Sequence, residues 1–557
     1  MASDPYSEKP WLRHYHIPHT LPLPEETILD SFERQARSRP QATAIQYFSR
    51  SFSYAELDHQ SGCFASLLAR FGVGKGDRIA VSLQNNPQFA IAQYGAWKRG
   101  AALVPLSPMY KGEELEYQLS DSGAKVWLGL ESLFTPPIRE AIERAGVAHV
   151  LTTSELDWVE DSPLPSPIAA SERIRGLGTL DLVSELSKIE PDAHNRLPLG
   201  LNDLAHLVYT SGTTGRPKGS MGLHKHIAFN ANVFRAWMNL TEADAVLGMA
   251  PLFHITGLVA HLAVAALAGM PLVLFHRFQP AEAFRMARTY NATFSVASIT
   301  AYIALLNDPA AKDGGFLKKC FTGGAAVAPA ITEQFESKCG CYIHNTYGLT
   351  EVNSPSHSVP LGSRAPVHTD SGALSIGVPI PNCDARIVDS ADPSRMVPPG
   401  EAGELCLKGP FVFEGYWNRP EATQAAFHDG WFLTGDIAIM DKEGWFYIVD
   451  RKKDMINASG YKVWPREVED VLYRHPAVRE AAVVGVPDDY RGETVKAVIA
   501  LQPDHEQTIS AQALIDFCRD KLATYKVPRQ VVFVDEIPKT ATGKFLRRQL
   551  RSGGETI

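Results

Sequence analysis

The residues best suited to chemistry lie between positions 210 and 218. Glycines let backbone N–H groups approach a ligand closely, hydroxyl side chains donate hydrogen bonds, and a lysine adds positive charge. The stretch combines all three, which predicts a phosphate-binding loop. We expect this loop to connect a buried strand at 204–208 with a helix that begins near His224. Its residues are Thr210, Ser211, Gly212, Thr213, Thr214, Gly215 and Lys218.

A Walker A loop and a disordered linker both fit this stretch less well. A Walker A loop counted from Gly212 would need a glycine where Pro217 stands and a serine or threonine where Gly219 stands. Both departures remove a working part of that loop. A disordered linker of glycine and threonine is the second alternative. The strand and helix patterns on either side of the loop argue against it.

A second group of polar residues lies at 344–351. Tyr347 offers a ring face to a base, Thr350 offers a hydroxyl to a phosphate, and Glu351 offers the hard carboxylate oxygen that Mg²⁺ prefers. Each residue alone would be weak evidence. Together, and downstream of a phosphate loop, they predict a nucleotide site.

These two motifs resemble those of the adenylate-forming superfamily, which includes acyl-CoA synthetases, aryl-CoA ligases, luciferases and adenylation domains. Most of the chain is similar to AMP-forming fatty acid–CoA ligases. The resemblance implies an α/β fold with a large N-terminal domain of stacked, parallel-rich sheets and helices. A small, mobile α+β domain would follow it. We place the domains at 1–452 and 453–557, with Lys453 as the hinge.

The resemblance assigns the ATP and AMP site to several segments. Asp436 could merely cap a turn, but the family's matching aspartate accepts both ribose hydroxyls, and Arg451 matches a second ribose contact. Lys544 lies in a charged tail that is usually solvated; it matches the lysine that contacts the acyl carboxylate and the α-phosphate. Glu351 and Thr213 are the expected Mg²⁺ ligands. The remaining expected nucleotide contacts are the 210–218 loop residues above, Gly323, Gly324, Ala325, Asn345, Thr346, Tyr347, Gly348, Thr350 and Ile448.

The acyl and CoA sites also follow from the resemblance. His254, which in isolation would be a packed loop histidine, matches a residue beside the acyl carboxylate. The expected acyl pocket consists of His254, Gly257, Gly348, Val352 and Asn353. CoA would bind at Ser459, Gly460 and Tyr461, where Gly460 lets the pantetheine arm pass the backbone. The expected catalytic residues are Lys544, Thr350, Glu351 and His254.

The resemblance therefore predicts an acid–thiol ligase that uses ATP, Mg²⁺ and CoA. A carboxylic acid would attack the α-phosphate of ATP and release pyrophosphate. The thiol of CoA would then attack the acyl-adenylate and release AMP. The small domain would rotate between the two steps, exchanging Lys544 for the Gly460 segment.

The acid expected from the resemblance is a medium- or long-chain fatty acid. The segment 352–358 is polar, however, so a short, branched or hydroxylated acid remains an alternative if Asn353, Ser354 or His357 faces the pocket. Equally, these side chains could point to solvent. Further alternatives are a non-CoA adenylating enzyme and a non-catalytic nucleotide sensor. A sensor would not need Glu351 and Lys544.

Periodic apolar patterns predict the elements that position these residues. A helix at 54–71, a strand at 78–83, a helix at 87–98 and a strand at 101–105 imply a parallel sheet with right-handed crossovers. A strand at 430–436 would place Asp436 at its end. The C-terminal region predicts a compact α+β unit. Its elements are helices at 464–473 and 509–522 and strands at 481–486, 497–501 and 531–534.

Composition limits the remaining possibilities. The chain has 557 residues, 45% of them hydrophobic, enough for more than one domain. Its net charge of −8 argues against a nucleic-acid surface. Seven scattered cysteines fit a reducing cytoplasm. The most apolar stretch, 258–275, contains His261 and Pro271, so no transmembrane segment is expected. Peripheral membrane contact is compatible with this composition, and we expect a monomer or a homodimer.

Overall fold

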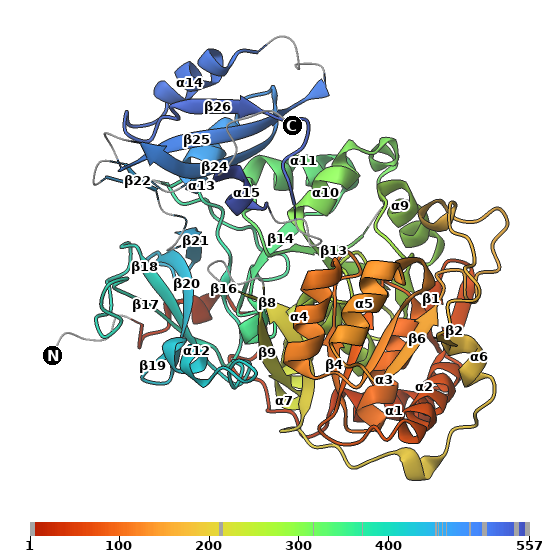
Figure 1. Cartoon of the computed structure of the whole chain (residues 1–557). Coiled ribbons are helices and arrows are strands. Elements are labelled where there is room, and N and C mark those ends of the chain that lie inside the picture. The colour runs from red at the N-terminus through yellow and green to blue at the C-terminus, as the bar shows by residue number, and fades with distance from the viewer. Residues whose placement is uncertain are drawn as a thin grey trace.

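The computed structural model describes residues 6–210, 216–315, 317–369, 371–451, 454, 456–458, 461–463, 465–488, 492–503, 509–539 and 545–551. Within these residues, three sheets form a large N-terminal domain and a fourth forms a small C-terminal domain, drawn in blue in Figure 1. The expected α/β class with a large and a small domain is confirmed. The expected boundary at 452/453 falls on residues outside the described part and stays a prediction.

One sheet of the large domain has the strand order β7-β6-β5-β3-β4-β8-β9. Strands β3 to β6 pair in parallel because helical crossovers connect them. The expected strand–helix–strand unit is confirmed, and its helix has the expected bounds, Pro87–Lys98. The elements are β3 (Arg78–Ser82), α3 (Pro87–Lys98), β4 (Ala102–Pro105), α4 (Gly112–Ser122), β5 (Val126–Leu130), α5 (Pro136–Arg144), β6 (His149–Thr153), β7 (Leu180–Asp181), α6 (Leu182–Leu186), β8 (Leu204–Thr210) and β9 (Lys218–Leu223).

A second sheet has the order β16-β15-β14-β13-β12-β10-β11-β1-β2. Its strands β12, β13 and β14 are parallel, so their carboxyl ends meet at one edge, where ligands bind in open α/β sheets. The strands are β1 (Thr43–Tyr47), β2 (Arg50–Ser53), β10 (Val246–Leu247), β11 (Leu272–Leu274), β12 (Phe294–Ala297), β13 (Lys319–Thr322), β14 (Ile343–Tyr347), β15 (His357–Ser358) and β16 (Val378–Pro379). The connecting helices are α9 (Pro280–Thr289), α10 (Ile299–Asn307) and α11 (Pro329–Cys339).

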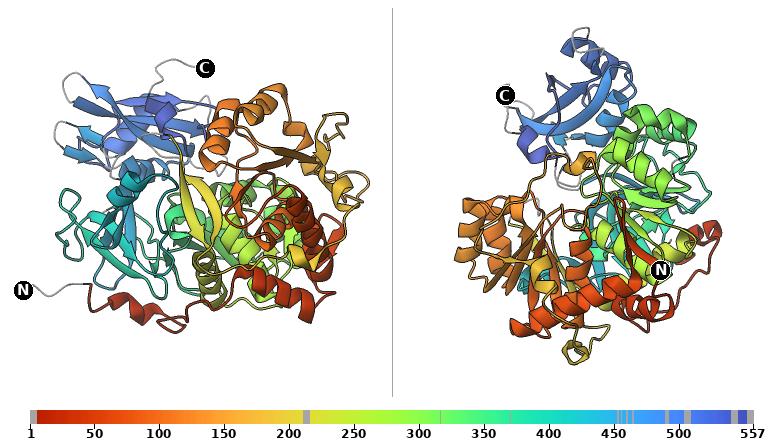
Figure 2. Two further views of the ribbon diagram at one scale, coloured as in Figure 1. Left: turned by 60° about the horizontal axis from the view of Figure 1, so that its bottom comes forward. Right: turned by 90° about the vertical axis from the view of Figure 1, so that its right-hand side faces the viewer.

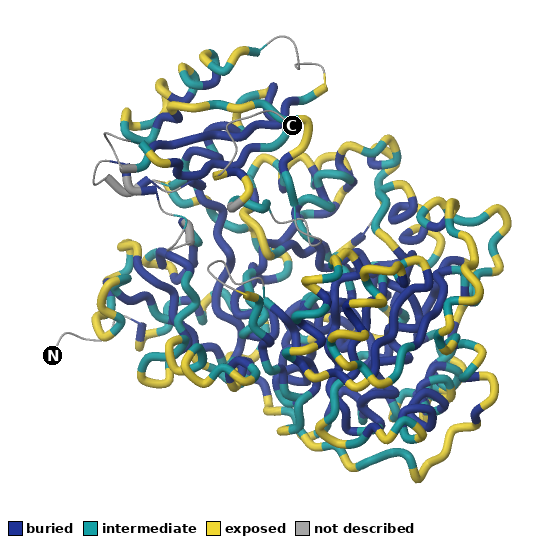
Figure 3. Tube along the Cα trace, in the orientation of Figure 1, coloured by how far each residue is buried: buried dark blue, intermediate teal, exposed yellow. Residues whose placement is uncertain are grey.

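The core of the large domain lies between and around these two sheets, where Figure 3 shows mostly buried chain. Helices α1 (Ile28–Ser38), α2 (Tyr54–Arg70) and α7 (His224–Trp237) pack there with α8 (Val264–Ala268). A π-helical turn at Gly257–Ala263 leads into α8, and all its residues are buried. The helix expected at 54–71 is α2.

The third sheet is antiparallel and contains Asp436. The expectation that Asp436 lies at a strand end is wrong: its strand, β20, runs from Trp431 to Met440. The strand continues because its second half pairs with β21. The elements are β17 (Asp384–Val388), β18 (Gly403–Lys408), α12 (Pro420–Ala425), β19 (Phe427–His428), β20 (Trp431–Met440) and β21 (Phe446–Arg451).

The small domain is a sheet packed against helices with a core of its own. Each of its expected helices and strands is present, and two of the strands, β24 and β25, are longer than expected because they form an extended hairpin. The elements are β22 (Ile456–Ala458), β23 (Tyr461–Val463), α13 (Pro465–Leu472), β24 (Val478–Asp488), β25 (Gly492–Leu501), α14 (Ala511–Arg519), β26 (Gln530–Phe533) and α15 (Arg547–Arg551). Among the described residues, no helix has both the length and the apolar character needed to span a bilayer.

Candidate active site

The phosphate-loop candidate connects two antiparallel strands. β8 and β9 pair from Leu204 opposite Leu223 to Thr210 opposite Lys218, and the left view of Figure 2 shows this hairpin, in yellow, running toward the small domain. The expectation of a strand–loop–helix unit is therefore wrong, because β9 precedes α7. Of the site residues expected in the loop, Thr210 and Lys218 are described. The expected sites Ser211, Gly212, Thr213, Thr214 and Gly215 lie outside the described residues.

Strand β9 was not expected, because it contains Gly219 and Gly222, and glycines weaken a strand pattern. Close packing explains why each position is a glycine. A Cβ on Gly219 would lie 2.9 Å from Cδ1 of Leu207, and one on Gly222 would lie 2.8 Å from Oδ1 of Asn353. Real Cβ atoms essentially never come so close to other atoms. The glycines thus let β9 pack closely against Leu207 and Asn353. They also weaken the sequence pattern by which a strand is normally predicted.

A tyrosine that was not predicted from the sequence joins two candidate residues. The hydroxyl of Tyr416 donates to Oε1 of Glu351 at 2.8 Å, and Nζ of Lys218 lies 4.2 Å from the centre of its ring. Burial and the nearby Glu351 raise the pKa of Tyr416, so it remains a donor at neutral pH. Tyr416 therefore positions a carboxylate and an ammonium group on one side of the site.

A second tyrosine joins two further motifs. The hydroxyl of Tyr347, at the end of β14, donates to Oδ2 of Asp436 at 2.6 Å. Asp436 is buried and faces Arg451 across the β20–β21 pair, although the side chain of Arg451 lies outside the described residues. The three residues expected to hold the nucleoside are thus brought together from two sheets.

The backbone around Tyr347 is tightly packed. A Cβ on Gly323 would lie 2.7 Å from the carbonyl oxygen of Thr346, so only glycine fits at the end of β13. The side chains of Asn345 and Thr346 are buried and donate to the carbonyls of Ser375 and His357, both at 2.9 Å. Gly324 and Ala325, next to Gly323, are exposed.

His254 and Gly257 lie at the start of the π-helical turn. The imidazole Nδ1 of His254 accepts a hydrogen bond from the N–H of Thr256 at 3.3 Å, and the ring is partly exposed. A Cβ on Gly257 would lie 2.1 Å from the carbonyl oxygen of Pro251, so the turn requires glycine. The π-helix was not predicted. π-helical turns are frequent at functional sites.

The polar segment after Glu351 is buried, so the alternative in which it points to solvent is wrong. Asn353 is 1% exposed and donates to the carbonyl of Phe411 at 3.1 Å. The ring of His357 packs against Phe446, and burial lowers its pKa to about 3, which keeps it neutral. Val352 is also fully buried, and its carbonyl accepts from the side chain of Asn230 at 2.8 Å.

Lys544, Lys453, Ser459 and Gly460 lie outside the described residues, as does the side chain of Tyr461. The backbone of Tyr461 pairs with Ala458 in the β22–β23 hairpin. The carbonyl of Ile448 accepts a hydrogen bond from a small-domain arginine, Arg466.

The residues present fit a magnesium ion held largely by nucleotide phosphates. Among the described residues no group of three or more histidine, cysteine, aspartate or glutamate side chains is arranged to hold a metal. Glu351 supplies one carboxylate on a partly exposed residue, and Glu351 and Lys218 both contact Tyr416. Mg²⁺ is typically held by one or two carboxylates together with substrate phosphates and water.

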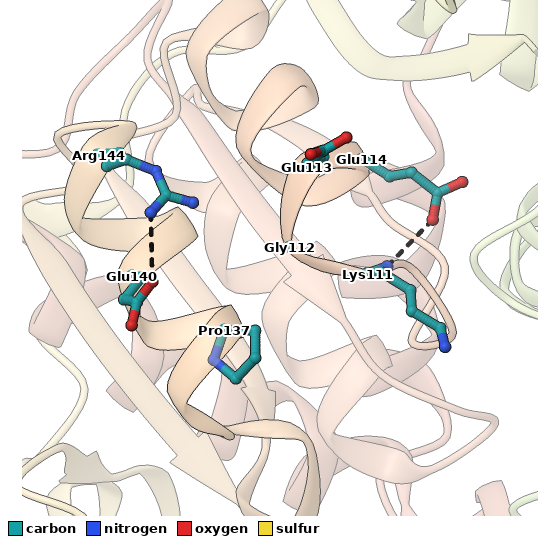
Figure 4. A pocket seen from close by; sticks show the side chains of 7 residues that line it. All are labelled: Lys111, Gly112, Glu113, Glu114, Pro137, Glu140 and Arg144. Carbon is teal, nitrogen blue, oxygen red and sulfur yellow. Dashed lines mark hydrogen bonds and ion pairs between the residues drawn. The ribbon is translucent and has the colours of Figure 1, made fainter.

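A hollow of about 380 Å³ lies at the start of α4 and α5. Figure 4 shows its charged lining, in which the Lys111 N–H donates to Glu114 and Arg144 pairs with Glu140. None of the expected site residues lines it.

Comparison with known proteins identifies the family. A model of the AMP-binding enzyme family matches residues 32–417, and one of the AMP-binding enzyme C-terminal domain matches residues 467–544. The chain belongs to the AMP-binding enzyme family. It is 38% identical over 561 residues to a long-chain-fatty-acid–CoA ligase of Bacillus subtilis, covering 98% of each chain. It is 34% identical over 523 residues to a feruloyl-CoA synthase of an Amycolatopsis species, covering 93% of this chain and 97% of the relative.

A solved structure extends the similarity to both domains. The anthranilate CoA ligase AuaEII in complex with anthranoyl-AMP has a TM-score of 0.82 and 27% identity, covering 96% of this chain and 98% of its own. Together with the family match, these relatives make the protein an AMP-forming acid–thiol ligase of the acyl-CoA synthetase class, with ATP and CoA as co-substrates.

Proposed function

We propose that the protein activates a medium- or long-chain fatty acid and transfers it to CoA. The observation that carries this proposal is the 38% identity to a long-chain-fatty-acid–CoA ligase over nearly the whole of both chains. The described residues around Val352 support it. The side-chain amide of Asn353 donates its hydrogen bond to the carbonyl of Phe411. The π-helical turn after His254 is apolar apart from His261. Both features disfavour a hydroxylated acid.

In the first step a carboxylate oxygen of the acid attacks the α-phosphorus of ATP and the bond to pyrophosphate breaks. Asp436 and Arg451 would hold the ribose, and Tyr347 would lie against the adenine. Lys218, the 211–215 loop and Thr350 would neutralise the phosphates as charge moves toward the leaving group. His254 would lie beside the carboxylate and keep it in line for attack.

Glu351 would hold a magnesium ion against the phosphates. When bound, Mg²⁺ supplies positive charge that stabilises the phosphate oxygens. The hydrogen bond from Tyr416 orients Glu351 for this role and leaves the second carboxylate oxygen available to the ion.

In the second step the thiol of CoA attacks the acyl-adenylate carbonyl, and AMP leaves with the electron pair of the broken C–O bond. The two steps require different groups beside one carbonyl. Lys544 would serve the first step, and the segment of Ser459, Gly460 and Tyr461 would admit pantetheine in the second. We place the hinge for this exchange at Lys453, between domains 1–452 and 453–557.

One assay tests the acid and the reaction together. Pyrophosphate and AMP are measured with ATP and each member of a panel: fatty acids of 4 to 18 carbons, hydroxylated acids, benzoate, anthranilate and ferulate, with and without CoA. We expect kcat/KM to be at least tenfold higher for acids of 8 to 18 carbons, with acyl-CoA as the product. ADP formation, or preference for a short or hydroxylated acid, would refute the proposal.

An aromatic acid is the second candidate. The similarity to a feruloyl-CoA synthase and the fold match to an anthranilate CoA ligase favour it. The same panel decides between the two, because an aromatic-acid ligase would prefer ferulate, benzoate or anthranilate over every fatty acid.

We also propose a cytoplasmic location. All seven cysteines are buried free thiols, a state typical of a reducing compartment. The expectation of a monomer or homodimer is open to measurement by light scattering.

A further inference from the structure

Arg466 crosses from the small domain to the nucleotide side of the large domain. It is the second residue of α13, and its side chain is only 9% exposed. Its guanidinium donates from Nη1 to the carbonyl of Ile448 at 3.2 Å and from Nη2 to the carbonyl of Val327 at 3.4 Å. Both acceptors belong to the large domain.

The two carbonyls belong to the segments that form the candidate nucleotide site. Ile448 lies in β21 opposite Ala438, two residues beyond Asp436 in β20. Val327 is fully buried and lies in the loop that connects Gly323, after β13, to α11. Figure 1 shows α13 beside β21 where the domains meet, and the two elements are in contact. One guanidinium therefore connects the small domain to both segments.

The groups around Arg466 fix the position of its guanidinium. Nε lies 3.6 Å from Oδ2 of Asp470, one turn further along α13, and the Asp470 side chain is 10% exposed. A buried charge is costly unless it is paired and hydrogen-bonded, so the two carbonyls and Asp470 stabilise the guanidinium at this position. Rotation of the small domain would remove both carbonyls at once. Because a guanidinium is more weakly hydrated than an ammonium, burying and exposing it costs less, and such a contact can break and re-form.

We propose that Arg466 is a positioning residue that holds the small domain in the orientation in which the acyl-adenylate forms. The proposal rests on the proposed two-step reaction. The orientation itself is supported by the fold match across both domains to a solved structure that holds ATP, the substrate of the first step. The contact favours arginine, because its rigid planar fork reaches two carbonyls from separate nitrogens, while a lysine ammonium is a compact charge centred on one nitrogen.

The decisive experiment measures domain orientation directly. All native cysteines are buried, so spin labels can be attached at Glu333→Cys in α11 and Asp520→Cys after α14, both exposed positions. With ATP bound, we expect a dominant interdomain distance in the otherwise unchanged chain. Its population should fall at least threefold in R466A and less in R466K. An unchanged distance distribution in R466A would overturn the proposal, whatever the activity.

Separate rates of adenylate formation and thioester formation provide the second test of the role of Arg466. R466A should lower pyrophosphate release from acid and ATP five- to twentyfold while changing thioester formation from synthetic acyl-AMP less than twofold. Equal losses in both steps, or a larger loss in the second, would overturn the assigned orientation. R519A is the matched control, because the exposed Arg519 pairs with Asp516 inside the small domain. If the unmodified chain releases no pyrophosphate, the proposed function fails, and the distance measurement still decides the role of Arg466.

Discussion

The hydroxyl of Tyr347 and the carboxylate of Asp436 lie 2.6 Å apart, although 89 positions separate the residues in the chain. Tyr347 ends β14, which pairs in parallel with β13 and antiparallel with β15 in one sheet, while Asp436 lies within an antiparallel strand of another. The hydrogen bond therefore fixes how the two sheets meet at the proposed nucleoside site.

Tyr347→Phe keeps the ring and removes only this donor. A hydrogen bond to a charged group contributes about 1.5–3 kcal/mol, so we expect kcat/KM for ATP to fall roughly 10- to 100-fold. Initial rates of pyrophosphate release against ATP concentration measure the effect. Tyr347→Ala should cost more, because it also removes the ring. Equal rates for Tyr347→Phe and the unmodified chain would exclude a role for the hydroxyl.

The fold was largely predictable from local pattern, and α3 illustrates why. Pro87 marks its start, and buried strands flank it on both sides. β9 was not predictable, because Gly219 and Gly222 suppress the strand signal for reasons that lie in Leu207 and Asn353. Local patterns record the periodicity of an element but not the neighbours that it packs against.

The site was predictable only in part, for the same reason. Glu351 and Lys218 have side chains whose chemistry suggests phosphate and metal binding on their own. Tyr416 does not, because its role depends on contact with Glu351 across 65 positions of sequence. Arg466 likewise has no local signal, since its acceptors are backbone carbonyls of the other domain.

Glu351→Gln tests the metal-binding role. The amide keeps an acceptor for Tyr416 but loses the charge that would hold Mg²⁺. We expect pyrophosphate release to fall by roughly 10²–10³-fold, by analogy with the loss of a charge-stabilising group, and half-saturation to need more Mg²⁺. Titration of the rate with MgCl₂ measures both. Tyr416→Phe is the comparison: it keeps the charge of Glu351 and the ring beneath Lys218, so it should cost roughly 10- to 100-fold and change the Mg²⁺ requirement less than Glu351→Gln does.

Lys544→Ala tests whether Lys544 acts in adenylate formation and not in thioester formation. It should abolish adenylate formation and largely spare thioester formation from synthetic acyl-AMP, because the lysine would contact the phosphate only in the first step. Equal losses in the two assays would contradict the role.

Lys453→Pro, which stiffens the hinge, should slow the second step more than the first. An unchanged thioester rate in that variant would count against domain rotation.

Gly257→Ala tests the π-helical turn beside His254. The added methyl group would meet the backbone of Pro251 at 2.1 Å, so the turn must shift. Overpacking of this kind costs about 1–3 kcal/mol, and we expect a melting temperature several degrees lower together with slower adenylation. Thermal unfolding followed by circular dichroism measures the shift. Gly74→Ala is the matched control, because a Cβ there meets no atom within 4 Å. Equal melting temperatures for the two variants would show that the turn can accept a side chain.

Asp470 should make the stability of the small domain depend on pH. Burial raises the pKa of its carboxyl from 3.8 to about 6, although the nearby Arg466 partly opposes this, while the nearby Glu469 reinforces it. A carboxyl whose pKa is raised by folding binds protons more strongly in the folded chain. Its stabilising contribution is therefore complete below pH 3.8 and is lost as pH rises through about 6.

Asp470→Asn removes this titration while keeping the size of the side chain. A shift of this size corresponds to roughly 2–3 kcal/mol, so the stability of the unmodified chain relative to Asp470→Asn should decline by up to that amount between pH 4 and pH 7. Urea unfolding of both proteins at several pH values measures the difference and cancels the titration of every other group. A difference that is constant with pH would mean that Asp470 keeps its ordinary pKa. Repeating the series in R466A should move the decline to higher pH, because the guanidinium stabilises the charged carboxylate.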